Sequence, residues 1–200
     1  MLNGKSLLIL VTQFERHGKE LQAVLDALGA LTDKAMPGAP QDPARALKNF
    51  YGVKHPLYFK NASAGLYRGF AEIRGCIAEV LETVTRTPGL IYQVNTLGGK
   101  IADPGLAAGS CFPHRDRPFL SELQAYWETP GREAKLLESF RAIQRRFSRH
   151  GITAQYGNYP DIELANWETA YYGESVTRLR AVKRRYDPEN IFRHEQSVKP

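Results

Sequence analysis

Two tyrosines and an asparagine near the end of the chain are the side chains best suited to acid–base chemistry. They lie in Gln155-Tyr156-Gly157-Asn158-Tyr159, in a stretch that predicts a strand over residues 152–159. Alternate side chains of a strand point to opposite faces, which would place Tyr156 with Asn158 and Tyr159 on the other face. A phenol becomes a base near neutral pH only when positive charge or hydrogen bonds lower its pKa from about 10. Such tyrosines also commonly pack a core and hydrogen-bond their hydroxyl groups, so the residues alone leave both interpretations open.

Gly157 separates the two aromatic positions of this segment. A glycine inside a strand often marks a place where a ligand or another stretch of backbone comes close. We therefore expect a flat ring or a neighbouring chain segment to approach at residue 157.

A histidine next to two arginines forms a second candidate site, in His114-Arg115-Asp116-Arg117. Histidine titrates near neutral pH, and the arginine guanidinium binds carboxylates or lowers the pKa of a nearby phenol. The competing interpretation is a polar surface loop that follows Phe112-Pro113.

The predicted last helix, residues 176–186, combines an apolar stripe with a basic face. The stripe consists of Val176, Leu179, Val182 and Tyr186, and the basic face of Arg178, Arg180, Lys183, Arg184 and Arg185. We expect the stripe to be buried and the basic face to be solvated or to contact a partner. Because no nucleic-acid motif accompanies these cations, we expect no nucleic-acid partner.

Composition favours one domain with a single core. The chain has 200 residues, 42% of them hydrophobic, and Lys+Arg 27 against Asp+Glu 21 give a mild net charge of +6. Cys76 and Cys111 are too few for a disulfide framework and lack metal-ligand spacing, so we expect reduced thiols and no metal site. The apolar run at residues 7–11 is too short for a signal peptide or a membrane span, which predicts a cytoplasmic protein without membrane contact.

The hydrophobic pattern predicts strands alternating with helices. The strands are expected at residues 6–14, 57–60, 90–96 and 152–159, the helices at 21–28, 70–84, 130–149 and 176–186, and an exposed proline-rich loop at 36–43. No glycine-rich nucleotide fingerprint follows a strand, and Gly98-Gly99 is typical of a turn. This order predicts an α+β fold with a largely antiparallel sheet, covered by helices on one face, and a C-terminal helical tail.

The spacing of the last fifty residues resembles the carboxyl-terminal signature of the berberine-bridge-enzyme-like FAD-linked oxidases. The matching segments are Tyr156–Asp161, Tyr171-Tyr172-Gly173, Arg178-Leu179, Val182-Lys183, Tyr186-Asp187-Pro188 and Asn190–Ser197, with weaker matches at Leu97-Gly98-Gly99 and Phe112–Arg115. The resemblance implies the substrate domain of a vanillyl-alcohol-oxidase/PCMH-type flavoprotein. It divides the chain into a substrate-binding α+β domain at residues 1–155 and a family-specific segment at 156–200, packed on that domain or on a flavin-domain partner.

The resemblance also implies roles for individual side chains. Tyr159 is the implied general base, and Tyr156 is a wall of the site or an alternative base. Asn158 is implied to lie near the flavin, and His114 and Arg115 to contact the substrate. Asp187, Asn190 and Phe192 are expected to form a turn and an apolar anchor.

The resemblance implies a substrate-binding half of a flavin-dependent oxidoreductase, which oxidises an alcohol or similar carbon by hydride transfer to flavin N5. Relatives bind FAD on a domain that precedes this one, and no Gly-Gly-His segment for flavin attachment occurs here. We therefore expect FAD only with a partner chain, and an exposed apolar surface where that partner docks. Two alternatives stay open. The chain is either a flavin-free module that binds a small molecule or catalyses proton transfer or cyclisation, or a noncatalytic, homodimeric interaction piece.

Overall fold

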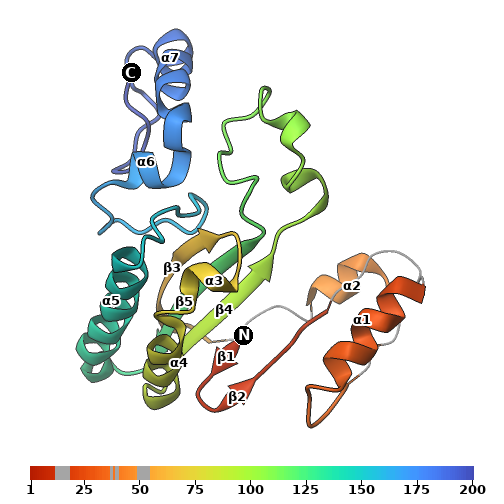
Figure 1. Ribbon diagram of the computed structural model, residues 1–200. Helices are drawn as coiled ribbons and strands as arrows, with labels where there is room; N and C mark the ends of the chain where they lie inside the picture. The colour runs from red at the N-terminus through yellow and green to blue at the C-terminus, as the bar shows by residue number, and fades with distance from the viewer. Residues whose placement is uncertain (12–18, 37, 39–40, 49–54) are drawn as a thin grey trace. The chain divides into compact units, whose positions relative to one another are not determined.

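A computed structural model describes the chain except residues 12–18, 37, 39–40 and 49–54 (Figure 1). The chain divides into two compact units. The larger unit comprises residues 1–7 and 57–200, and the smaller comprises residues 8–56. All side chains proposed above for chemistry belong to the larger unit, and the predicted boundary between residues 155 and 156 stays a prediction.

The smaller unit contains two helices, α1 (Lys19–Gly29) and α2 (Pro43–Lys48). The predicted helix at residues 21–28 is thus confirmed. The Asp42 carboxylate accepts a hydrogen bond from the Ala44 amide at 2.9 Å, which stabilises the start of α2. Part of the proline-rich loop lies outside the described residues, as does the end of the strand predicted at 6–14. Of the described residues in that span, only Ser6–Leu7 form a strand.

The larger unit is built on a five-stranded sheet in the order β2-β1-β4-β5-β3. The strands are β1 (Leu2–Asn3), β2 (Ser6–Leu7), β3 (Tyr58–Tyr67), β4 (Leu90–Thr96) and β5 (Phe119–Trp127), and all neighbouring strands pair antiparallel. This confirms the antiparallel α+β prediction. The pattern predicted β4 correctly, underestimated β3 at 57–60, and missed β5, which lies between β4 and β3.

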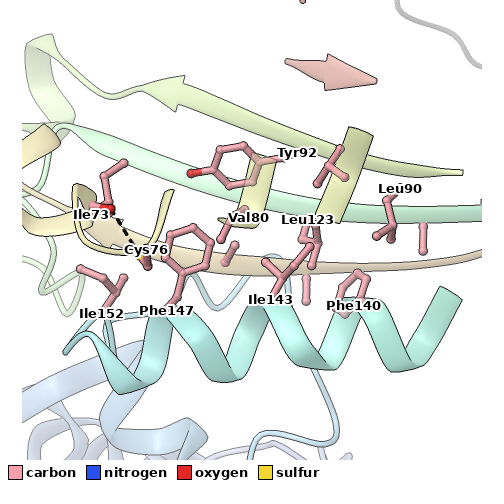
Figure 2. Close-up of a cluster of buried hydrophobic side chains, with 14 of the residues drawn as sticks. Ile73, Cys76, Val80, Leu90, Tyr92, Leu123, Phe140, Ile143, Phe147 and Ile152 are labelled. Carbon is pink, nitrogen blue, oxygen red and sulfur yellow. Dashed lines mark hydrogen bonds between the residues drawn. The ribbon is translucent and has the colours of Figure 1, made fainter. Parts of the chain in front are cut away.

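Two helices, α4 (Ile77–Arg86) and α5 (Glu133–Arg149), pack on one face of the sheet. Figure 2 shows Phe140, Ile143 and Phe147 of α5 pointing at the strands, as their helical spacing predicts. Both thiols are free, and Cys76 lies buried in this core with its Sγ donating to the Ile73 carbonyl at 3.4 Å.

The single helix predicted at residues 70–84 is wrong, because the chain forms α3 (Phe70–Ile73) and then a turn before α4. The turn contains Gly75, whose helix propensity is low. A Cβ at this position would lie 3.3 Å from the His150 ring, so the missing side chain permits close approach of the end of α5.

The strand predicted at residues 152–159 is also wrong. The segment makes isolated hydrogen bonds to β3, from the Leu66 amide to the Ala154 carbonyl at 2.9 Å and from the Ser63 amide to the Tyr159 carbonyl at 3.1 Å. A bulge at Gly65, with φ of 123°, shifts the register of β3 there. A Cβ on Gly65 would lie 2.2 Å from Ile152 Cγ2, so this close approach requires glycine.

The tail contains α6 (Trp167–Tyr172), which was not predicted, and α7 (Val176–Tyr186), which was. Short 3₁₀ turns η1 (Gly99–Ile101), η2 (Pro104–Leu106), η3 (Pro130–Arg132) and η4 (Gly173–Ser175) link the main elements. The expected buried stripe of α7 is wrong, since Val182 is 46% and Tyr186 73% exposed. Polar contacts of Arg178 and Arg180 tie this helix to the rest of the unit.

In the described part of the chain, no helix has the length and apolar character that crossing a membrane requires. The same residues contain no group of three or more His, Cys, Asp or Glu side chains placed to hold a metal ion.

Candidate functional site

A turn gathers Tyr156, Asn158 and Tyr159 into one cluster. The Tyr159 amide donates to the Tyr156 carbonyl at 3.0 Å, closing the turn. Asn158 Nδ2 donates to the Tyr156 hydroxyl at 2.8 Å, and the two tyrosine rings meet edge-on with centroids 5.2 Å apart. The predicted separation of Tyr159 from the other two is therefore wrong, because the period-2 rule does not hold through a turn.

The close approach expected at Gly157 comes from within the chain. A Cβ at residue 157 would lie 3.5 Å from the Tyr171 Cβ and 3.8 Å from the Tyr172 hydroxyl. Gly157 thus lies against α6.

The register of the sheet places a carboxylate next to this turn. Leu123, Ala125 and Trp127 of β5 enter the helix-covered core, so Glu122 points away from α4 and α5. Glu122 is only 4% exposed and accepts a hydrogen bond from Asn61 Nδ2 at 2.6 Å.

Glu122 lies near Tyr159, because Ser63 of β3 pairs with Glu122 and its amide donates to the Tyr159 carbonyl. Burial raises the pKa of Tyr159, and the negative charge of Glu122 and the neighbouring Tyr156 raise it further. The phenol is therefore protonated at neutral pH and has a carboxylate beside it as proton acceptor. Sequence reasoning missed Glu122 because it missed β5, although the alternation of Glu122 and Gln124 with Leu123 and Ala125 was a usable signal.

Further polar side chains lie near Glu122 on what we call the distal face, the side of the sheet that points away from α4 and α5. Its polar side chains on β4 and β5 are Gln93, Asn95, Glu122, Gln124 and Tyr126, beside apolar Ile91 and Leu120. Gln93 Nε2 donates to Asn95 Oδ1 at 2.8 Å, and the Tyr126 hydroxyl to Gln124 Oε1 at 3.2 Å. The Tyr126 ring stacks on Phe59 of β3 at 6.2 Å, and Phe59 is 64% exposed. The distal face thus offers amides beside an accessible aromatic ring.

Buried hydrogen bonds fix the backbone just after the turn. The Asp161 amide donates to the Tyr171 hydroxyl at 2.8 Å, and Gln196 Nε2 donates to the Asp161 carbonyl at 2.6 Å. The Asp161 carboxylate accepts from Lys60 Nζ at 2.9 Å and from Gln144 Nε2 at 2.7 Å. These motif residues therefore position the turn.

His114 and Arg115 lie apart from the Glu122–Tyr159 pair. His114 is 6% exposed, and burial followed by the charge of Arg117 lowers its pKa, while backbone groups nearby oppose that shift. Arg115 Nη1 donates to the carbonyls of Lys100 and Ile101 at 3.0 and 2.9 Å. Both residues line a pocket of about 490 Å³ that does not include Tyr159 or Glu122. Their substrate role stays a prediction.

Much of the basic face of α7 is engaged within the chain. Arg178 Nη1 donates to the Ala108 carbonyl at 2.8 Å, and Arg180 pairs with Glu168 at 2.6 Å. Lys183 pairs with the Asp187 carboxylate, which also accepts the Ile191 amide at 2.7 Å. These contacts lower the pKa of Asp187 and form the predicted turn. Phe192, expected to anchor this turn, is instead 79% exposed.

The fold matches solved flavoproteins. A chitooligosaccharide oxidase structure superimposes with a TM-score of 0.74 and 22% identity, covering 92% of this chain and 44% of that one. Berberine bridge enzyme from Eschscholzia californica superimposes with a TM-score of 0.64 and 20% identity, covering 78% of this chain and 36% of that one. At these identities the match shows the fold alone, and it confirms the predicted α+β fold with an antiparallel sheet.

Sequence comparison finds longer relatives. The Bacillus subtilis protein named uncharacterized FAD-linked oxidoreductase YgaK is 30% identical over 94% of this chain and 42% of its own length. Chitooligosaccharide oxidase of Gibberella zeae is 27% identical over 98% of this chain and 41% of its length. The family model "Berberine and berberine like" matches residues 155–199. Residues 155–199 thus carry the segment that this family model describes, and the whole chain is similar to these FAD-linked relatives while spanning less than half of their length.

Proposed function

We propose that this chain supplies the substrate-facing part of a FAD-dependent oxidoreductase that oxidises an alcohol or similar C–H centre. The observation that carries the proposal is the buried Glu122 carboxylate beside the Tyr159 hydroxyl. A buried acid against a phenol is a costly arrangement for stability alone, and it supplies a matched proton donor and acceptor at one place.

The turn residues fit contact with one side of a flat ring. Asn158 is exposed, and its amide is oriented by the hydrogen bond to the Tyr156 hydroxyl. Asn158 and Tyr156 are therefore the residues we assign to the isoalloxazine end of the cofactor. A bound FAD would accept a hydride from the substrate carbon.

Tyr159 and Glu122 would together remove the proton of the substrate hydroxyl. Because its pKa is raised, Tyr159 is a neutral phenol and is not itself a strong base. In the proposed step the substrate O–H proton moves to the Tyr159 oxygen while the phenol proton moves to the Glu122 carboxylate. The substrate thus loses a proton to this chain and a hydride to the cofactor, which leaves a carbonyl.

The distal face favours a substrate with several hydroxyl groups. Gln93, Asn95 and Gln124 offer amide donors and acceptors, and the exposed ring of Phe59 offers an apolar surface beside them. Amides next to an accessible aromatic ring suit a molecule that is polar at its edges and apolar on its faces. The likeness to proteins named chitooligosaccharide oxidase supports a carbohydrate or a similar polyol.

We further propose that a separate chain provides the FAD-binding domain. Exposed apolar side chains cluster in sequence near the end of α7 and after it: Val182, Tyr186, Ile191 and Phe192. Such side chains favour a protein contact, and the other cations of this region, Arg184 and Arg185, are exposed.

Flavin retention tests this function. We would purify the chain alone and together with a FAD-binding-domain protein encoded beside it, then record visible flavin absorbance and light scattering. The expected result is a colourless chain alone and a yellow complex that oxidises polyols. Stoichiometric flavin on the chain alone would contradict the separate-chain proposal. A colourless protein with every such partner would contradict the oxidoreductase proposal and favour a flavin-free or noncatalytic module.

A further inference from the structure

The pocket beside His114 is separate from the proposed catalytic pair. It measures about 490 Å³ and lies between the loop at residues 107–117, residues 153–154 and the end of α6 with η4. A volume of about 300–1,000 Å³ is usual for sites that bind small organic molecules.

Arginine side chains in this pocket have unused hydrogen-bonding capacity. The buried Nε atoms of Arg115 and Arg117 have no hydrogen-bond partner in the described chain. The Asp116 carboxylate lies 3.9 Å from Arg117 Nε, which is too far for a hydrogen bond. Arg115 uses Nη1 on two backbone carbonyls, so Arg117 is the less engaged cation. Buried donors without partners call for a ligand or ordered water.

The remaining lining is positively biased and partly hydroxylated. Ser110, Thr153, Thr169 and Ser175 bring hydroxyl groups to it. Glu174 is the one acidic residue among the described lining side chains, and it is exposed. His114, with a buried Nε2 that has no hydrogen-bond partner in the described chain, completes the polar side of the pocket.

We propose that this pocket binds a small organic anion whose carboxylate or phosphate group is received by Arg117, with Arg115 and His114 beside it. Guanidinium groups pair with both oxyanions through charge-assisted hydrogen bonds. The volume exceeds what an inorganic ion fills, and Phe112 and Pro113 contribute apolar surface for the body of the ligand. The site is additional to the oxidation proposed above.

Phe112 connects this pocket to the turn cluster. Its ring meets His114 edge-on at 5.6 Å and Tyr156 edge-on at 6.3 Å. A ligand that contacts Phe112 therefore shares one aromatic wall with the residues assigned to flavin contact. Occupancy of the pocket should accordingly alter the surroundings of Tyr156.

Three probes with the same aromatic body test the proposal on the chain alone: benzoate, phenyl phosphate and neutral benzyl alcohol, by titration calorimetry. We expect both anions to bind at least about tenfold more tightly than the alcohol, and the tighter anion identifies the headgroup. Arg117→Gln should weaken anion binding about tenfold, as expected for one charge-assisted hydrogen bond. Arg184→Gln, the same charge change at an exposed α7 position, should leave it within about twofold.

The salt dependence of anion binding to the unmodified chain gives a test that does not depend on whether the variants fold. Anion binding to a partly buried arginine should survive physiological ionic strength, whereas diffuse surface attraction is screened. Equal affinity for all three probes, or an equal loss with Arg184→Gln, would overturn the proposal. Because no flavin is present, failure here leaves the oxidoreductase test untouched.

Discussion

The two faces of the central sheet carry different kinds of side chain. The face under α4 and α5 is filled by apolar side chains such as Leu123 and Phe147, each less than 2% exposed. The distal face carries amides, a carboxylate and a phenol, and Glu122 is buried there with a hydrogen bond from Asn61. One face stabilises the fold by removing apolar surface from water, and the other keeps polar groups that stability alone does not favour.

Side chains are therefore buried for two different reasons in this molecule. Phe147 is buried because hydrophobic packing requires it. Glu122 is buried beneath Asn61 and the turn at Tyr159. Its negative charge adds to the effect of burial in raising the pKa of Tyr159. Substitutions on the two faces should therefore separate stability from activity.

Glu122→Gln should give the largest effect of all these substitutions, and this effect should be on activity. In the FAD-loaded complex we expect the rate of substrate-dependent flavin reduction to fall about 10²- to 10⁴-fold, the range for loss of a general base. Glu138→Gln, at an exposed position on α5, is the matched control and should change nothing. Rapid-mixing absorbance measures the step. A loss smaller than about tenfold would remove Glu122 from the proton path.

Phe147→Ala should give the largest effect on stability. Its ring is fully buried and stacks on Tyr92 at 5.9 Å, so truncation should cost about 3–5 kcal/mol in the free energy of unfolding. Urea denaturation of the chain alone measures it. Phe192→Ala, at a side chain 79% exposed, is the control and should stay within about 0.5 kcal/mol. Equal losses would show that the helix-covered face is not the main core.

The helix-covered face could be predicted and the distal face could not. The spacing of Phe140, Ile143 and Phe147 predicts both the helix and its buried side, because 3.6 residues per turn place these three side chains on one face. In β5, Glu122 and Gln124 alternate with Leu123 and Ala125, but buried Ser121 shares the face of Leu123 and Leu120 shares that of Glu122, which weakens the alternation that marks a strand.

The candidate site depended on contacts that are remote in sequence. The motif directed attention to Tyr156 and Tyr159, but their relative placement follows from the turn and from the Ser63–Tyr159 backbone hydrogen bond. Likewise, Gln196 reaches the Asp161 carbonyl across 35 positions. Periodicity carries no information about such partners, so the family resemblance located the segment but not its geometry.

Tyr171→Phe should have an intermediate effect on both properties. Removing the hydroxyl leaves the buried Asp161 amide without its acceptor, which should cost about 1–3 kcal/mol. The loosened turn should also lower the oxidation rate by displacing Tyr159. Tyr186→Phe, at a ring 73% exposed, removes the same hydroxyl group as the control. A Tyr171 variant with altered stability but unchanged rate would separate the hydrogen-bond network from the site.

The smallest expected effect concerns pH, because it involves the titration of one side chain. Burial and Arg117 lower the pKa of His114 in the folded state below the value of 6.5 for a free histidine. As pH falls through 6.5, the unfolded chain therefore binds a proton that the folded chain does not, and stability declines. The stabilised carboxylates Glu163 and Asp187 titrate at lower pH, since their pKa values are also lowered, to about 2 for Glu163.

His114→Asn should flatten the stability profile between about pH 7.5 and 5.5, whereas His194→Asn at an exposed position should preserve it. An unchanged slope in His114→Asn would mean that this histidine is not held neutral by the fold.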